Sequence, residues 1–261
     1  MKYIHRLAAL AFAVGFSVAA TAAQAEQVKV GVAAEPYPPF SSQDASGTWV
    51  GWEIEIIGAV CKAAELDCVV KPTAWDGIIP ALTSGQIDAI MTSMNITEER
   101  LKTIDFSDKY YKTPAAIVGT KGVEIAPTAK GLAGKVIGVQ ASTIHQAYVE
   151  KHFKGSLAEV KVYQTQDEAN QDLAAGRIDA TQADSIAMDA FLATDAGKAC
   201  CAMKGMVADD PNVLGKGVAV GLRKGSDQLK AAFNSGIAKI RKDGTYDAIT
   251  AKYFKSSIYG G

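Results

Sequence analysis

Two polar clusters follow apolar segments that read as strands, and each holds a residue suited to one charged group. Thr92-Ser93-Met-Asn95 follows the apolar segment 87–91 and leads to Arg100, whereas Asp184 follows the segment 178–182. The guanidinium of an arginine matches a carboxylate with two hydrogen bonds, and an aspartate accepts hydrogen bonds from an ammonium. If the two clusters face each other, a zwitterionic α-amino acid satisfies both.

Arg100 taken alone has a simpler interpretation. Thr97 with Glu98 and Glu99 indicates the start of a helix, so Arg100 lies on its first turn, where the helix dipole disfavours a cation. A solvated surface charge is the alternative there. The combination with Asp184 favours an anion site.

An internal duplication provides the elements that position these residues. Leu82-Thr-Ser-Gly-Gln-Ile-Asp-Ala89 and Leu173-Ala-Ala-Gly-Arg-Ile-Asp-Ala180 lie 91 positions apart, and the β-branched segments 28–32 and 135–139 open the two halves. Each half alternates strand and helix patterns, which predicts an α/β fold of two similar lobes. Because ligands bind beyond the carboxyl ends of strands in such sheets, we expect a site between the lobes.

The order of the segments predicts a discontinuous first lobe. Residues 26–113 and 217–261 are expected to form lobe 1, and residues 114–216 to form lobe 2. The apolar strands near 113–119 and 211–218 are expected to cross between the lobes.

The first 25 residues have the features of a secretory signal peptide. Lys2 and Arg6 precede an apolar run from Leu7 to about Ala20, and Ala23-Gln-Ala25 fits the cleavage site. The run is too short for a membrane span, although an uncleaved anchor is the alternative. Removing the segment changes the formal charge from −1 to −3. We therefore expect an exported protein that is not embedded in a membrane and lacks the basic surface that nucleic acid requires.

The four cysteines fall into two pairs. Cys61 and Cys68 can join the end of a helix to the next strand, and export favours a disulfide between them. A metal site is the alternative, but no second cysteine pair or nearby histidine supports it. His145 and His152 lack a third ligand and are expected to be surface residues. Cys200 and Cys201 are adjacent, so a vicinal disulfide, an intermolecular bridge and two free thiols all stay open.

Further residues are expected to line the cleft. Tyr37 and Trp75 offer flat faces to a ligand side chain, although a core role for Trp75 is the alternative. The other predicted cleft residues are Glu35, Trp52, Thr92, Ser93, Asn95, Val139, Ser142 and Thr143. No nucleophile is paired with a base, and no phosphate or dinucleotide motif is present, so we expect neither a catalytic site nor a cofactor.

Several motifs resemble those of the polar amino-acid group of bacterial periplasmic solute-binding proteins. They are Tyr37-Pro-Pro-Phe40, Trp75-Asp-Gly-Ile-Ile-Pro-Ala-Leu82, Ser93-Met-Asn-Ile-Thr-Glu-Glu-Arg100, Asp105-Phe-Ser107, Gln140-Ala-Ser-Thr143, Asp243-Gly-Thr-Tyr-Asp247 and Tyr253-Phe254. The ending Ile258-Tyr-Gly260 and the spacing of Cys61 and Cys68 resemble the lysine/arginine/ornithine- and histidine-binding branch, which has opine-binding relatives. The resemblance covers essentially the whole chain after the signal peptide.

The resemblance implies a two-lobed periplasmic binding protein that closes on its ligand. Arg100, with Ser93 and Thr143, would bind the α-carboxylate, and Asp184, with Ser93, would bind the α-ammonium. It also implies a monomer in the periplasm of a Gram-negative cell that delivers ligand to an ABC permease.

Two residues differ from those of the lysine/arginine/ornithine binders at positions that concern the ligand side chain. Ala34 and Asn95 stand where lysine/arginine/ornithine binders have an aspartate and a serine, and Glu35 is expected to replace the lost acid. A cationic amino acid or an opine is the expected ligand. The alternatives are a cyclohexadienyl (arogenate/prephenate) dehydratase on the same fold, with Glu35 or His145 as acid or base, and a sensor that docks on a chemoreceptor.

Overall fold

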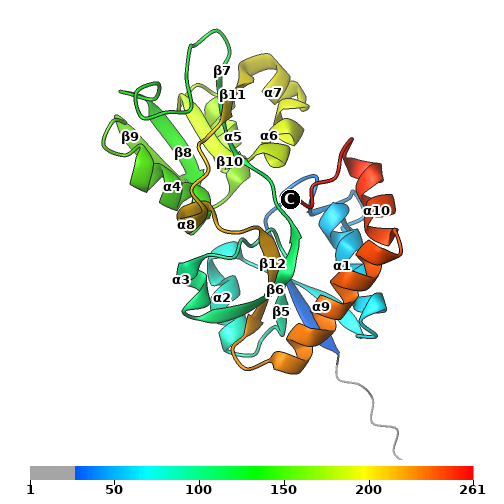
Figure 1. The fold of residues 1–261 in the computed structure, drawn as a ribbon. Helices are drawn as coiled ribbons and strands as arrows, with labels where there is room; N and C mark the ends of the chain where they lie inside the picture. Colours follow the sequence, from blue (N-terminus) through cyan, green and yellow to red (C-terminus); the bar gives the residue numbers. More distant parts are fainter. Residues whose placement is uncertain (1–26, 261) are drawn as a thin grey trace, which may run out of the picture.

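The computed structural model describes residues 27–260, which form two lobes with an α/β sheet in each (Figure 1). The strand order is β4-β1-β5-β12-β6 in lobe 1 and β11-β7-β10-β8-β9 in lobe 2. The predicted signal peptide lies outside the described residues. Within them, no helix is long and apolar enough to cross a membrane.

Lobe 1 contains both ends of the described chain. Its sheet strands are β1 (Val28–Ala33), β4 (Cys68–Thr73), β5 (Ala89–Ile90), β6 (Ile104–Tyr111) and β12 (Val218–Arg223), and a hairpin joins β2 (Ser42–Gln43) to β3 (Trp49–Val50). Its helices are α1 (Trp52–Ala63), the 3-10 turn η1 (Trp75–Gly77), α2 (Ile78–Thr83), α3 (Glu98–Leu101), α9 (Asp227–Lys242) and α10 (Thr245–Tyr253).

Lobe 2 is the central part of the chain. Its strands are β7 (Ala115–Thr120), β8 (Val136–Gln140), β9 (Glu159–Tyr163), β10 (Ala180–Asp184) and β11 (Cys201–Met206). Its helices are α4 (Ile144–His152), α5 (Gln166–Ala174), α6 (Ser185–Leu192), α7 (Asp195–Cys200) and α8 (Pro211–Leu214). In each lobe three strands run parallel, with β1 between β4 and β5, and β8 between β9 and β10.

The duplicated segments occupy equivalent places in the two lobes. Gly85 and Gly176 follow α2 and α5 with φ of +79° and +70°, a backbone conformation that glycine adopts without strain. The aspartates of the repeat tie the central strands in place: Asp88 Oδ2 accepts from the Lys29 N–H at 2.9 Å, and Asp179 Oδ2 from the Val136 N–H at 2.8 Å. The repeat in the sequence therefore corresponds to a repeat in the structure.

The predicted crossing strands belong to the sheets themselves. β7 pairs with β10 and β11 in lobe 2, and β12 pairs with β5 and β6 in lobe 1. Both strands are almost entirely buried, and strands that are apolar on both faces are stabilised inside a sheet. The chain passes between the lobes at 112–114, between β6 and β7, and at 215–217, between α8 and β12, and both segments overlap the predicted crossing ranges (Figure 1).

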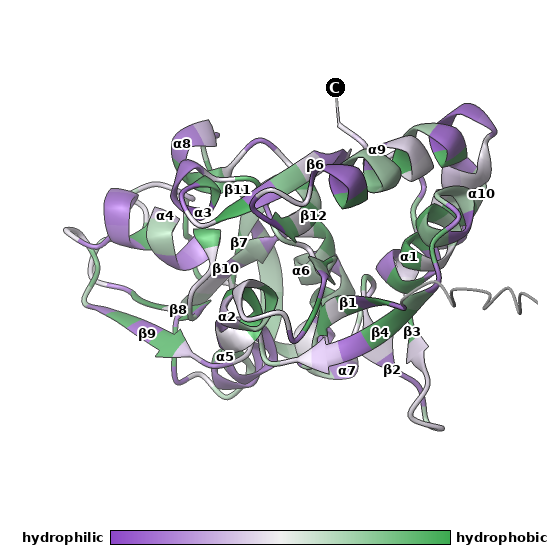
Figure 2. Ribbon diagram, turned by 90° about the horizontal axis from the view of Figure 1, so that it is seen from below, coloured by the Kyte–Doolittle hydropathy of each residue, from purple (hydrophilic) through white to green (hydrophobic). Residues whose placement is uncertain are grey.

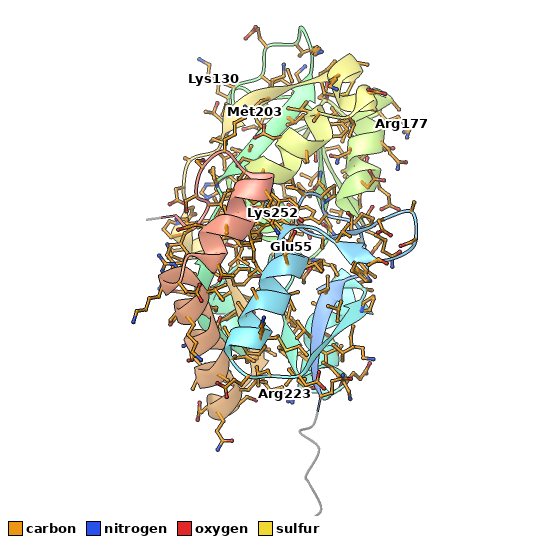
Figure 3. The ribbon with its side chains drawn as sticks, turned by 90° about the vertical axis from the view of Figure 1, so that its right-hand side faces the viewer. Glu55, Lys130, Arg177, Met203, Arg223 and Lys252 are labelled. Atoms are coloured by element: carbon orange, nitrogen blue, oxygen red, sulfur yellow. A yellow bond between two sulfur atoms is a disulfide. The ribbon has the colours of Figure 1, made fainter. Side chains whose placement is uncertain are left out.

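The helices of lobe 1 cover an aromatic core. Phe40, Trp52, Tyr110 and Tyr246 are almost completely buried there, and α1 packs beside α9 and α10. α9 carries hydrophobic and hydrophilic residues on different sides, as an amphipathic helix over a core should (Figure 2). On the outer surface, Lys252 of α10 lies against Glu55 of α1 (Figure 3).

Both cysteine pairs form disulfides. Cys61 at the end of α1 is bonded to Cys68 at the start of β4, as predicted from the sequence. Cys200 and Cys201 form a vicinal disulfide at the junction of α7 and β11, one of the three arrangements that the sequence left open.

Candidate functional site

A cavity lies between the lobes, where the carboxyl ends of their parallel strands meet. Lobe 1 lines it with Ala33, Glu35, Pro36, Tyr37, Trp75, Thr92, Ser93, Asn95 and Arg100. Lobe 2 lines it with Gln140, Thr143, Ile144, His145, Gln166 and Asp184. The structure thus brings together most of the predicted cleft residues from segments far apart in the chain.

Arg100 is a half-buried cation without an anionic protein partner among the described residues. Its Nη1 donates to the Asn95 carbonyl at 2.9 Å, and its Nη2 donates to the Ser142 carbonyl of the other lobe at 3.4 Å. The guanidinium also lies over the Trp75 ring, 5.4 Å from its centroid. Burial lowers the pKa of Arg100 to about 10, and the group stays charged at neutral pH. A carboxylate ligand would offset this loss of hydration.

Asp184 supplies the opposite charge from lobe 2. It is 4% exposed at the end of β10 and accepts hydrogen bonds from the Tyr37 hydroxyl at 2.9 Å and the Thr113 hydroxyl at 3.0 Å. His145 Nε2 lies 3.9 Å from its Oδ1. Burial, and then Asp184 itself, raise the pKa of the Tyr37 hydroxyl, which therefore stays a donor. Tyr37 comes from lobe 1, so this bond spans the cleft.

Ser93 is held by a buried carboxylate that the sequence did not reveal. Its φ is +53°, and both its N–H and its hydroxyl donate to Glu53, at 2.8 and 3.1 Å. Glu53 is fully buried at the start of α1 and accepts a third hydrogen bond from Tyr110. Burial raises the pKa of Glu53 to about 7. While Glu53 is ionised, both donors of Ser93 are occupied, and its hydroxyl oxygen can only accept from a ligand.

Glu35 and Trp75 occupy the loop ends after β1 and β4. The Glu35 carboxylate accepts the Trp75 N–H, at 3.3 Å to Oε1 and 3.2 Å to Oε2, which places a negative charge at the start of η1. The indole Nε1 of Trp75 is buried and has no partner among the described residues. This part of the cavity therefore combines a carboxylate with an aromatic face.

The remaining polar residues have defined roles in their loops. Thr92 Oγ1 accepts from the Ala33 N–H at 2.9 Å, and Asn95 is 7% exposed. Thr143 caps α4, since its hydroxyl accepts from the Gln146 N–H at 3.1 Å and donates to the Gln140 carbonyl at 2.7 Å. Ser142 does not line the cavity and contributes its carbonyl to Arg100.

Trp52 and Val139 are not cavity residues, contrary to expectation. Both are 0% exposed. Trp52 begins α1, and its indole lies within the aromatic core, where Nε1 donates to the Thr250 hydroxyl at 3.1 Å. Val139 on β8 packs with Ile144 and Tyr148 in the lobe 2 core.

The structure also corrects the expectation for His145 and places further residues, which were not predicted, at the cavity. His145 is 6% exposed beside Asp184, so the expectation of a surface residue was wrong. Gln140, Ile144, Gln166, Ala33 and Pro36 were missed. The repeat does contain a signal for Gln166: the 91-position shift that aligns the two copies also aligns Gln166 with Trp75 and Asp184 with Ser93. No cluster of three metal-ligating side chains occurs within residues 27–260.

Comparisons with known proteins agree with this architecture. Residues 28–256 match the model of the family described as bacterial extracellular solute-binding proteins, family 3. The lysine/arginine/ornithine-binding periplasmic protein of Escherichia coli strain K12 is 40% identical over 255 residues, which cover 97% of each chain. The L-arginine-binding protein of Pseudomonas aeruginosa is 40% identical over 261 residues, which cover 100% of this chain and 99% of that protein.

A solved structure shares the arrangement of the lobes. It is described as an ancestral arginine-binding protein bound to arginine, is 35% identical and superposes with a TM-score of 0.79, covering 87% of this chain and 98% of its own. The sequence relatives and this structure are all binding proteins. The chain belongs to family 3 of the bacterial extracellular solute-binding proteins.

Proposed function

We propose that this protein binds a cationic L-amino acid, or a related opine, between its two lobes as the substrate-binding component of an ABC importer. The observation that carries the proposal is the pairing of Arg100, a half-buried cation to which no carboxylate of residues 27–260 is paired, with Asp184 on the opposite wall. An α-amino acid presents a carboxylate and an ammonium on one carbon and satisfies both.

The hydrogen bonds of the cavity refine these roles. Arg100 and the N–H groups at the start of α4, next to Thr143, suit the carboxylate, because the N-terminus of a helix favours an anion. Ser93 has no free donor, so we assign its oxygen to the ammonium together with Asp184 and withdraw it from the carboxylate.

The rest of the cavity suits a cationic side chain. Glu35 supplies a carboxylate, and Tyr37 and Trp75 supply aromatic faces, which attract cations. Thr92 and Asn95 add polar groups. Two relatives that share 40% of the sequence are named for binding lysine, arginine and ornithine, or arginine, which supports the same ligand class.

The proposed cellular setting follows from the family. We place the protein in the periplasm of a Gram-negative cell as a monomer that delivers its ligand to an inner-membrane permease. The named relatives are binding proteins, which favours this function over the dehydratase alternative.

A thermal-shift screen tests the ligand class. The protein is unfolded, freed of bound ligand, refolded and heated with arginine, lysine, ornithine, histidine, glutamine or octopine. A ligand that binds only the folded state raises the melting temperature as its concentration rises. We expect increases with cationic amino acids or octopine, and an unchanged melting temperature with all of them would contradict the proposal.

A further inference from the structure

Gln166 is a nearly buried amide at the wall of the cavity. It is the first residue of α5, directly after the loop that follows β9, and only 5% of its surface is exposed. An amide carries two hydrogens on Nε2 and an acceptor oxygen, Oε1. Its orientation therefore decides what it offers to a ligand.

Hydrogen bonds inside lobe 2 fix that orientation. The Gly138 carbonyl can only accept, so the Thr181 hydroxyl, at 2.9 Å, must donate to it. The Gln166 atom that lies 3.0 Å from the same hydroxyl oxygen must therefore be a donor, which identifies it as Nε2. The second hydrogen of Nε2 is donated to Asn170 Oδ1 at 3.0 Å.

The carbonyl oxygen of Gln166 is left as an acceptor. Both amide hydrogens bind lobe 2, and none of the described residues donates to Oε1. Because Gln166 lines the cavity and the orientation of its amide is fixed, this oxygen is available to accept a hydrogen bond from a donor of the ligand.

The position of Gln166 in the fold indicates which part of the ligand it contacts. Gln166 and Trp75 are equivalent in the repeat, and they follow β9 and β4, which are the edge strands of their sheets. The crossings join the sheets through β6 at the far edge of lobe 1 and β7 on the other side of lobe 2. Gln166 therefore lies at the same end of the cavity as Trp75 and Glu35.

We propose that the Gln166 carbonyl is a specificity-determining acceptor that binds the N–H donors of the ligand side chain, together with Glu35. The inference rests on the proposed binding of a cationic amino acid. A guanidinium or terminal ammonium supplies such donors, whereas an aliphatic side chain leaves the carbonyl unpaired.

Calorimetric competition with the Gln166→Met variant tests this role. Methionine has a similar volume but no acceptor of comparable strength. We expect arginine to bind about tenfold or more weakly to the variant, because a lost hydrogen bond to a charged group costs that much affinity. Norleucine, which has no side-chain donor, should bind both proteins with the same affinity.

Several outcomes would overturn the assignment. An equal loss for arginine and norleucine would indicate a purely structural role, and unchanged arginine affinity would exclude the contact. If Gln166→Met does not fold, Thr181→Val replaces it. This variant removes the hydroxyl that fixes the orientation of the Gln166 amide, so it should bind arginine more weakly while its affinity for norleucine is unchanged. Wild-type protein that binds none of arginine, lysine, ornithine, histidine and octopine would contradict the proposed function itself.

Discussion

Glu53 is a carboxylate whose ionisation opposes folding. It is 0% exposed, and burial raises its pKa from 4.5 to about 7. Between these values the unfolded chain releases the Glu53 proton while the folded chain keeps it. The unfolded state then binds fewer protons, so the free energy of unfolding falls as the pH rises through this window. Below pH 4.5 the contribution is constant, and above about pH 7 it has been lost.

We therefore predict that acidification from pH 7.5 to pH 5 raises the free energy of unfolding by about 2 kcal/mol through Glu53. Glu53→Gln removes the titrating group but keeps the shape of the side chain and an acceptor for the Ser93 N–H. The free energy of unfolding of this variant should therefore lack the increase at pH 5. Urea denaturation of both proteins at the two pH values measures the difference. Parallel pH profiles would contradict the ionisation assigned to Glu53.

At the scale of elements, the disulfide between Cys61 and Cys68 ties the end of α1 to the start of β4. Replacing both cysteines with alanine should lower the free energy of unfolding by about 2–3 kcal/mol, the cost of freeing a loop of this length in the unfolded chain. Guanidinium denaturation under oxidising conditions checks this value.

The second cysteine pair provides a matched control. Cys200 and Cys201 are adjacent, so their bond closes almost no chain. The double alanine variant of this pair should lose much less stability than that of Cys61 and Cys68. Equal losses would show that loop closure is not the source of the stabilisation.

Local patterns predict some elements well and others poorly. The parallel part of each sheet was predictable because β1 and β8 are rich in β-branched residues, and because Gly85 and Gly176 mark helix ends at equivalent places in the repeat. The edge strand β11 was missed, since its sequence Cys-Ala-Met-Lys-Gly-Met lacks a clear alternation. Its pairing with β7 is a tertiary effect.

The site was predictable where chemistry depends on residue type alone. Arg100 and Asp184 were identified as a pair, because an arginine and an aspartate that follow two strands match the carboxylate and the ammonium of an α-amino acid. Glu53 was missed, because a glutamate at a helix start reads as solvated, and Trp52 was wrongly predicted to line the cleft. Only the packing of α1 against Tyr110 and Thr250 determines where these side chains lie.

At the scale of the whole molecule, three hydrogen bonds hold the lobes in a closed arrangement. The Tyr37 hydroxyl of lobe 1 donates to the Asp184 carboxylate of lobe 2 and accepts from the Asp184 N–H, and Arg100 of lobe 1 donates to the Ser142 carbonyl of lobe 2. These bonds exist only while the lobes are closed. Removing one of them should shift the population towards open forms and reduce the apparent affinity for any ligand that needs closure.

Tyr37→Phe tests this coupling because it keeps the ring and removes only the hydroxyl. We expect ligand affinity to fall about tenfold, in line with the loss of a hydrogen bond to a carboxylate. Tyr253→Phe is the matched control, since the Tyr253 hydroxyl donates to Glu55 Oε1 at 2.7 Å within lobe 1. Calorimetric titration of both variants with the same ligand measures the effect, and equal affinities would exclude a role for the bond between the lobes.

The most direct test of the central claim is calorimetric titration of arginine into refolded, ligand-free wild-type protein and into Arg100→Ala. We predict saturable binding with one ligand per chain for the wild type and no detectable binding for the variant, because Arg100 is assigned the carboxylate common to all α-amino acids. Arg177→Ala, which removes an exposed arginine paired with Asp172, should bind like the wild type. Arginine binding that survives Arg100→Ala would contradict the account, and so would a folded wild-type protein that binds none of arginine, lysine, ornithine, histidine and octopine.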